Sequence, residues 1–81
     1  MGYSPFVRVL ISRLTHPDAR VRRLLLSVLT SLYERHQSPK QLVKLHSLAP
    51  LLERIQASDA GVLVRKVASE LYEAFKAHDV L

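Results

Sequence analysis

The sequence predicts an all-α protein, a fragment of a right-handed α-solenoid with about five helices. Apolar residues recur three and four positions apart, which is the spacing of one helix face. No segment shows the strict alternation of apolar and polar residues that a half-buried strand requires. One helical pattern also returns after about 43 residues. At 81 residues the chain forms one domain at most, and its small core gives little net stability, so we expect it to rely on neighbouring structure.

Two helices are predicted in the first half of the chain. Ser4-Pro5 marks the first start, because serine can cap free N–H groups and proline at the first helical position has no N–H to satisfy. This helix is expected to end near Thr15. His16-Pro17-Asp18 marks the second start, and that helix should continue to about His36. It is the predicted main core helix, with an inward stripe of Val21, Leu24, Leu25, Val28, Leu29 and Leu32, widened by Leu26.

Two short helices and one long helix are predicted in the second half. Ser38-Pro39 repeats the Ser-Pro start, and this helix should end near His46, followed by another from about 48 to 57. Residues 57–61 are the most turn-like stretch, because Ser58 and Asp59 can accept local backbone hydrogen bonds and Gly61 can adopt positive φ. The last helix should cover about 62–78, with an inward stripe of Val64, Val67, Ala68, Leu71, Tyr72 and Phe75.

An internal repeat relates the two halves. Residues 18–23 and 59–66 each place an acidic residue shortly before a valine and two basic residues, and the valines Val21 and Val64 are 43 positions apart. A period of about 40–47 residues is typical of armadillo and HEAT repeats. Such units cannot bury their apolar faces alone, so copies stack and form an extended surface. Within a single domain of residues 1–81, we expect 4–36 to be a partial repeat, its second and third helices, and 38–78 to be one complete armadillo-like repeat.

One part of the chain is more specific than the repeat pattern. It consists of three stretches: Leu24-Leu25-Leu26, the run Leu32-Tyr33-Glu34-Arg35-His36-Gln37-Ser38-Pro39-Lys40-Gln41-Leu42-Val43 and the later Val62-Leu63-Val64-Arg65-Lys66. Together they resemble the C-terminal armadillo-like region of septation-type protein kinases. That group includes fungal cytokinesis kinases and plant epsilon-type MAP kinase kinase kinases. The resemblance covers about residues 17–81. It implies a non-catalytic tail that localises or assembles a kinase.

The armadillo resemblance also implies a binding face on the third helix of each unit. Armadillo proteins that bind extended peptides usually carry Trp and Asn there. Here Ser27 and Glu70 stand in the Trp positions, and Ser31 and Ala74 stand in the Asn positions. We therefore do not expect a nuclear-import type of backbone clamp. The candidate partner-binding residues are Arg22, Arg23, Ser27, Ser31, Arg65, Lys66, Glu70 and Ala74.

Charge distribution leaves two classes of partner open. The net charge is +5, and residues 1–37 hold six arginines against Asp18 and Glu34. Such a half attracts acidic proteins or nucleic acid. A HEAT-like nucleic-acid-binding module would use Arg8, Arg13, Arg20, Arg22, Arg23 and Arg35. The basic residues are spread around their helices, however, and we expect no exposed aromatic residues among them for base stacking, so we favour a protein partner.

Motifs of other functional classes are absent from the sequence. There is no cysteine, no glycine-rich phosphate loop and no HExxH motif, and all four histidines fall at predicted helix ends. We therefore expect neither an enzyme nor a cofactor or metal. The longest apolar stretch is too short for a membrane span, and the cytoplasm is the expected location. Because the first two helices lack a preceding repeat, we expect an uncovered apolar face. Either missing upstream sequence covers it, or it pairs two copies as a homodimer.

Overall fold

The computed structural model describes residues 4–81, and helices account for most of them. The elements are α1 (Ser4–Ser12), the short 3-10 helix η1 (Arg13–Thr15), α2 (Ala19–Arg35), α3 (Pro39–Leu45), α4 (Leu48–Ser58) and α5 (Val62–Ala77). No strand occurs in this part of the chain. The all-helical prediction is therefore confirmed, and each helix lies close to its predicted bounds. The same described residues contain no helix that is both long and apolar enough to cross a membrane.

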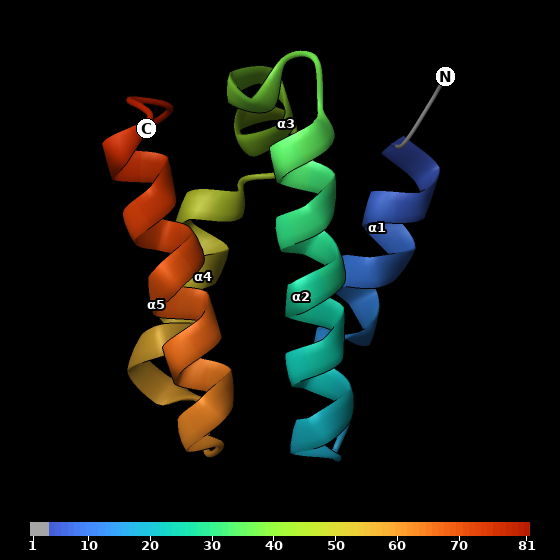
Figure 1. Cartoon of the computed structure of the whole chain (residues 1–81). Coiled ribbons are helices and arrows are strands. Elements are labelled where there is room, and N and C mark those ends of the chain that lie inside the picture. Colours follow the sequence, from blue (N-terminus) through green and yellow to red (C-terminus); the bar gives the residue numbers. More distant parts are fainter. Residues whose placement is uncertain (1–3) are drawn as a thin grey trace.

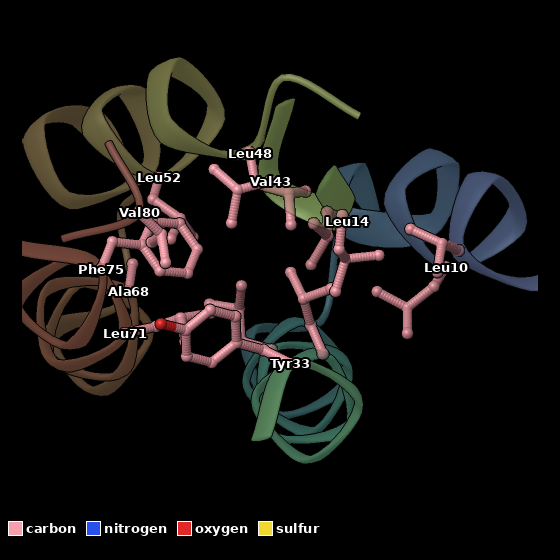
Figure 2. Close-up of a cluster of buried hydrophobic side chains, with 14 of the residues drawn as sticks. Leu10, Leu14, Tyr33, Val43, Leu48, Leu52, Ala68, Leu71, Phe75 and Val80 are labelled. Atoms are coloured by element: carbon pink, nitrogen blue, oxygen red, sulfur yellow. The ribbon is translucent and has the colours of Figure 1, made fainter. Parts of the chain in front are cut away.

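The helices form two layers. Figure 1 shows the two long helices, α2 and α5, side by side and running in the same direction, with α1 on the side of α2 that is turned away from α5. The contact between α4 and α5 is the most extensive, followed by that between α2 and α5. Figure 2 looks along the helices and shows α1, α3 and α4 above the layer that α2 and α5 form. Both long helices therefore begin at the same end of the molecule.

A single apolar core lies between the layers (Figure 2). Among the described residues, no polar or charged residue is fully buried. The rings of Tyr33 and Phe75 pack with their centroids 4.9 Å apart and join α2 to α5. The largest fully buried side chains come from four helices: Phe75, Leu26, Leu29, Leu48, Leu52, Val7 and Val64.

The predicted core face of α2 was partly wrong. Leu24 and Val28 were expected to point inward, but they are 62% and 41% exposed. The fully buried residues are Leu26 and Leu29, both of which were predicted, together with Tyr33. Helix α2 carries apolar residues around much of its circumference, because it has neighbours on two sides. These neighbours bury only part of that apolar surface. The predicted inward stripe of α5 is confirmed, since its residues are all buried or half-buried.

Two local expectations about helix starts were also wrong. Ser38 makes no side-chain cap for α3. Its backbone N–H donates to Nδ1 of His36 at 2.9 Å. Gly61 has a φ of −85°, which any residue can adopt. Space favours glycine there, because a Cβ would make tight contacts, 3.0 Å from Cγ2 of Val64 and 3.2 Å from Cβ of Ala19. The glycine thus permits the starts of α2 and α5 to approach each other.

The C-terminal end of α5 folds back onto the core. The Val80 N–H donates to the Phe75 carbonyl at 3.0 Å, and the Asp79 N–H donates to the Lys76 carbonyl at 3.2 Å. Together with the φ of 56° at Asp79, these two bonds form a Schellman motif. The motif places the Val80 side chain in the core beside Leu52 and Phe75 (Figure 2).

Candidate partner-binding surface

An ion pair between Arg22 and Asp59 joins the two halves of the chain at the end where α2 and α5 begin. Nε and Nη2 of Arg22 donate to the two carboxylate oxygens of Asp59, both at 2.9 Å. Only 13% and 11% of the two side chains are exposed. Nη1 of Arg22 also donates to the carbonyls of His16 and Pro17, at 2.6 and 3.1 Å. One guanidinium therefore ties the loop before α2 to the loop before α5.

The same arginine contact occurs in both halves. Nη1 of Arg65 donates to the carbonyl of Asp59, six residues earlier, as Nη1 of Arg22 donates to the carbonyl of His16, also six residues earlier. Helices α2 and α5 begin at Ala19 and Val62, which are 43 positions apart. The two arginines thus occupy equivalent local positions, in agreement with the spacing found in the sequence.

The surroundings of Asp59 favour its charged form. Burial by itself would raise the pKa of the carboxyl, but hydrogen bonds from Arg22 and from the Gly61 N–H, together with the charges of Arg22 and Arg65, lower the pKa below its usual value. The carboxylate is therefore ionised and paired at neutral pH. Its oxygen also accepts the Gly61 N–H at 2.8 Å, which orders the turn that leads into α5.

A groove of about 380 Å³ runs between α2 and α5. Three of the predicted partner-binding residues, Ser27, Glu70 and Ala74, line it. Arg23 lines a second hollow, between the starts of the same two helices. The structure therefore brings half of the predicted set onto one side of the molecule, along the contact between the two long helices.

The remaining predicted residues lie elsewhere. Ser31 and Lys66 are exposed outside the lining of both hollows. Arg22 and Arg65 are half-buried and bonded to the loops that precede α2 and α5. Those bonds leave little of either guanidinium for a partner. The Arg22–Asp59 pair was not foreseen, because its members are 37 positions apart and no local pattern relates them.

Sequence reasoning missed a pair of aromatic residues at the far end of the groove. The Tyr33 hydroxyl and Nδ1 of His78 are 2.9 Å apart, and the two rings stack with centroids at 5.9 Å. Burial raises the pKa of Tyr33. Glu34 and Glu70 lie in the same lining, so this end of the groove is acidic whereas the end near Arg23 is basic. An extended or helical ligand with charges of both signs matches this arrangement.

Two of the histidines at the helix ends, His16 and His36, bond the backbone through their rings. Nδ1 of His16 accepts from the Asp18 N–H at 3.0 Å, and Nδ1 of His36 accepts from the Ser38 N–H at 2.9 Å. Each bond spans two residues and shapes the turn before the next helix. Across residues 4–81, no three His, Cys, Asp or Glu side chains gather in a way that would hold a metal ion.

The fold and this surface define an all-helical segment whose two long helices begin 43 positions apart. No family model matches the chain. No solved structure matches it significantly either. It is similar to MAP3K epsilon protein kinases 2 and 1 of Arabidopsis thaliana, at 35% and 36% identity, and to MAP3K epsilon protein kinase 1 of Brassica napus, at 38% identity, in each case over 80 residues. The predicted resemblance to plant epsilon-type kinases is therefore confirmed.

The similarity covers most of this chain but only a small part of each kinase. The matched segment covers 90% of this chain but only 6% of the length of each kinase. The chain therefore corresponds to a small region of much longer proteins. Such a match is consistent with a non-catalytic region of a larger kinase.

Proposed function

We propose that the chain is a non-catalytic protein-binding module, a regulatory or localising region of a larger protein such as a septation-type kinase. The observation that carries the proposal is the match of nearly the whole chain to 6% of the length of plant MAP3K epsilon kinases. A segment of 81 residues is far smaller than a kinase catalytic domain, and it contains none of the glycine-rich phosphate-binding sequence that such a domain requires. The module needs no cofactor, and we place it in the cytoplasm.

The architectural part of the proposal is a short right-handed solenoid of armadillo or HEAT type. Residues 4–36 form its partial unit and residues 38–78 its complete unit. The equivalent arginine contacts and the 43-residue spacing of the α2 and α5 starts support two copies of one design. In such an arrangement each unit buries the apolar face of its neighbour and leaves a continuous surface for partners.

The proposed binding surface follows α2 and α5. Its accessible members are Arg23 and Lys66 towards the helix starts and Glu70 with Ser27, Ser31 and Ala74 further along. Charges of both signs along α2 and α5 select a partner whose own charges run in the opposite order, because like charges brought together weaken binding.

A pair of charge-reversal variants tests this surface. The intact chain, the Arg23→Glu/Lys66→Glu variant and a control with Lys40→Glu and Arg54→Glu are used to capture proteins from a cell extract. The control changes the net charge equally but on exposed positions of α3 and α4. We expect a specific protein to bind the intact chain and the control, and to be lost from the first variant. Identical capture by all three would contradict the proposed surface.

Nucleic-acid binding is the competing hypothesis, and the same proteins test it. Binding of a short DNA duplex should fall by about 10³-fold or more between 50 and 200 mM salt if several phosphate contacts carry it. Protein binding through a mixed-charge groove should change far less. The ion pair of Arg22 with Asp59 removes one of the six arginines from those available for phosphates.

A further inference from the structure

A hollow of about 380 Å³ lies between α4 and the first two helical elements, α1 and η1. The backbones of α1 and α4 do not approach each other closely, which leaves this space between them. Its volume falls within the range of about 300–1,000 Å³ that ligand sites occupy in proteins. The apolar part of its lining consists of side chains at the edge of the core: Ile11, Leu14, Leu51 and Ile55. We call this space the α1–α4 hollow.

Basic side chains gather at the α1–α4 hollow. Arg54 of α4 and His46, the residue after α3, belong to its lining, which contains no carboxylate. Arg8 of α1 and His36 lie close enough to His46 for their charges to act on its ring. Within residues 4–81, neither Arg8 nor Arg54 takes part in an ion pair. Four segments of the chain thus contribute basic groups, and the two arginines keep their charges available to a ligand.

Two features of α4 preserve this positive character. Glu53, the neighbour of Arg54 in sequence, accepts a hydrogen bond from the Tyr72 hydroxyl and lines a different hollow. Ser47 lines the α1–α4 hollow but makes no side-chain cap for α4, so it leaves the first N–H groups of this helix unpaired. The N-terminus of a helix carries partial positive charge. Both features favour an anion beside the basic side chains.

The ring of His46 makes no hydrogen bond within residues 4–81, although it belongs to a half-buried residue. The rings of His16, His36 and His78 each bond a backbone N–H or a tyrosine hydroxyl. Burial and the charges of Arg8 and His36 lower the pKa of His46. A carboxylate beside this ring would oppose that effect, because a nearby negative charge stabilises the protonated form.

The lining of the α1–α4 hollow selects among possible occupants. The phosphates of a nucleic acid would leave its aliphatic side chains in water, and the lining contains no aromatic residue on which a base could stack. Two copies of the chain each carry a net charge of +5 and repel each other at long range. An acidic protein segment with an aliphatic side chain complements both the basic and the apolar part of the lining.

We propose that the α1–α4 hollow binds an acidic segment of a partner protein. A carboxylate of that segment pairs with Arg54 and with the protonated ring of His46, and Arg8 adds long-range attraction. A neighbouring aliphatic side chain packs against Ile11 and Ile55, and its burial contributes affinity. The proposal rests on the proposed protein-binding function and adds a second surface, with a different partner from that of the groove between α2 and α5.

A short capped peptide in which aspartate and leucine alternate provides the probe. One comparison peptide replaces each aspartate with asparagine, and the other replaces each leucine with serine. Binding of each labelled peptide to the 81-residue chain is measured by fluorescence anisotropy. We expect the parent peptide to bind at least about tenfold more tightly than either comparison peptide.

Matched protein variants locate the binding. In Arg8→Gln/Arg54→Gln the affinity for the parent peptide should fall at least about tenfold. The control, Arg20→Gln/Lys40→Gln, removes the same charge from exposed positions outside the lining and should bind as the intact chain does. Because all four side chains are exposed, both variants should keep the circular dichroism spectrum and melting temperature of the intact chain.

An NMR titration of His46 provides a readout that a change of net charge elsewhere does not move. Saturation with the parent peptide should raise the pKa of His46, because a paired carboxylate stabilises the imidazolium form. The ring signals of His16, which lies outside the lining, should not move when the peptide is added.

Four results would overturn the proposal: equal binding of the aspartate and asparagine peptides, equal loss in both variants, an unchanged pKa of His46 at saturation, or binding of a DNA duplex but of no peptide. A dimer in light scattering that only Arg8→Gln/Arg54→Gln dissociates would also overturn it. That result would assign the hollow to a second copy and support the homodimer expected from the sequence.

The groove between α2 and α5 is tested separately. The capture control Lys40→Glu/Arg54→Glu should keep the protein that binds through Arg23 and Lys66 but lose the acidic peptide, because Arg54 lines only the α1–α4 hollow. Failure of the peptide with intact capture would therefore remove this inference and leave the proposed function standing.

Discussion

Replacing Arg22 with methionine should destabilise the protein more than any other single loss of charge. The substitution keeps the length of the aliphatic stem but removes both bonds to Asp59 and both bonds to the loop carbonyls. It leaves a carboxylate that is 11% exposed without its partner. Removing one member of a fully buried pair costs about 3–5 kcal/mol, which is an upper bound for this half-buried pair. We take the lower end, about 3 kcal/mol, because the Gly61 N–H continues to bond the carboxylate.

Thermal unfolding followed by circular dichroism measures this loss. In a domain of this size 1 kcal/mol shifts the melting temperature by about 4–8 °C, so Arg22→Met should lower it by about 12–24 °C. A double-mutant cycle with Asp59→Asn separates the pair from the other bonds of Arg22. The coupling free energy should be about 1.5–3 kcal/mol, the range of hydrogen bonds to charged groups.

Acid provides a second measurement of the same pair. Because the pKa of Asp59 is lower in the folded state than its usual 3.8, its contribution is fully present above about pH 4 and is lost as the pH falls through the folded pKa. Asp59→Asn should remove this part of the acid dependence. The control is Arg20→Met, since the Arg20 side chain is 85% exposed and its loss should leave the melting curve nearly unchanged. Equal effects of the two arginine substitutions, or a coupling below about 0.5 kcal/mol, would refute the reasoning.

Three further predictions concern the core, the end of α5 and pH. Leu29→Asp should abolish the cooperative unfolding transition, because an unpaired carboxylate at a fully buried position costs several kcal/mol, whereas Leu24→Asp should keep the native circular dichroism spectrum. Asp79→Gly should raise the free energy of unfolding by about 0.5–1 kcal/mol in urea titrations, because glycine adopts positive φ without strain; a decrease would contradict the Schellman geometry. Burial and the charges of Arg8 and His36 lower the pKa of His46 from 6.5, so protonation favours the unfolded chain, and stability should fall as the pH drops below about 6.5; His46→Gln should lose less between pH 7.5 and 5.5 than the intact protein.

Helix positions were predictable because the signals that set them are local. Asp18 caps α2 by accepting the Arg20 N–H at 2.9 Å, and proline at the start of α3 requires no N–H partner. The capping role expected of Ser38 failed, although its backbone N–H bonds a histidine two residues earlier just as that of Asp18 does. A cap therefore depends on side-chain position as well as on residue type.

The candidate surface was only partly predictable for the same reason. The repeat spacing correctly related Arg22 to Arg65 and directed attention to α2 and α5. It did not show that Arg22 would form an ion pair with Asp59, which lies in the other half of the chain. The contact of Tyr33 with His78 also spans 45 positions, beyond any periodic pattern.

The amino-acid sequence alone determined the helical class, the approximate bounds of every helix and the 43-residue spacing, because the periodicity of apolar residues and the chemistry of caps act within a few residues. Tertiary structure alone decided which apolar residues are covered. Leu24 and Leu29 belong to one predicted stripe, yet only Leu29 has neighbours that bury it. Burial depends on where other helices lie, and that placement comes from packing between segments far apart in the chain.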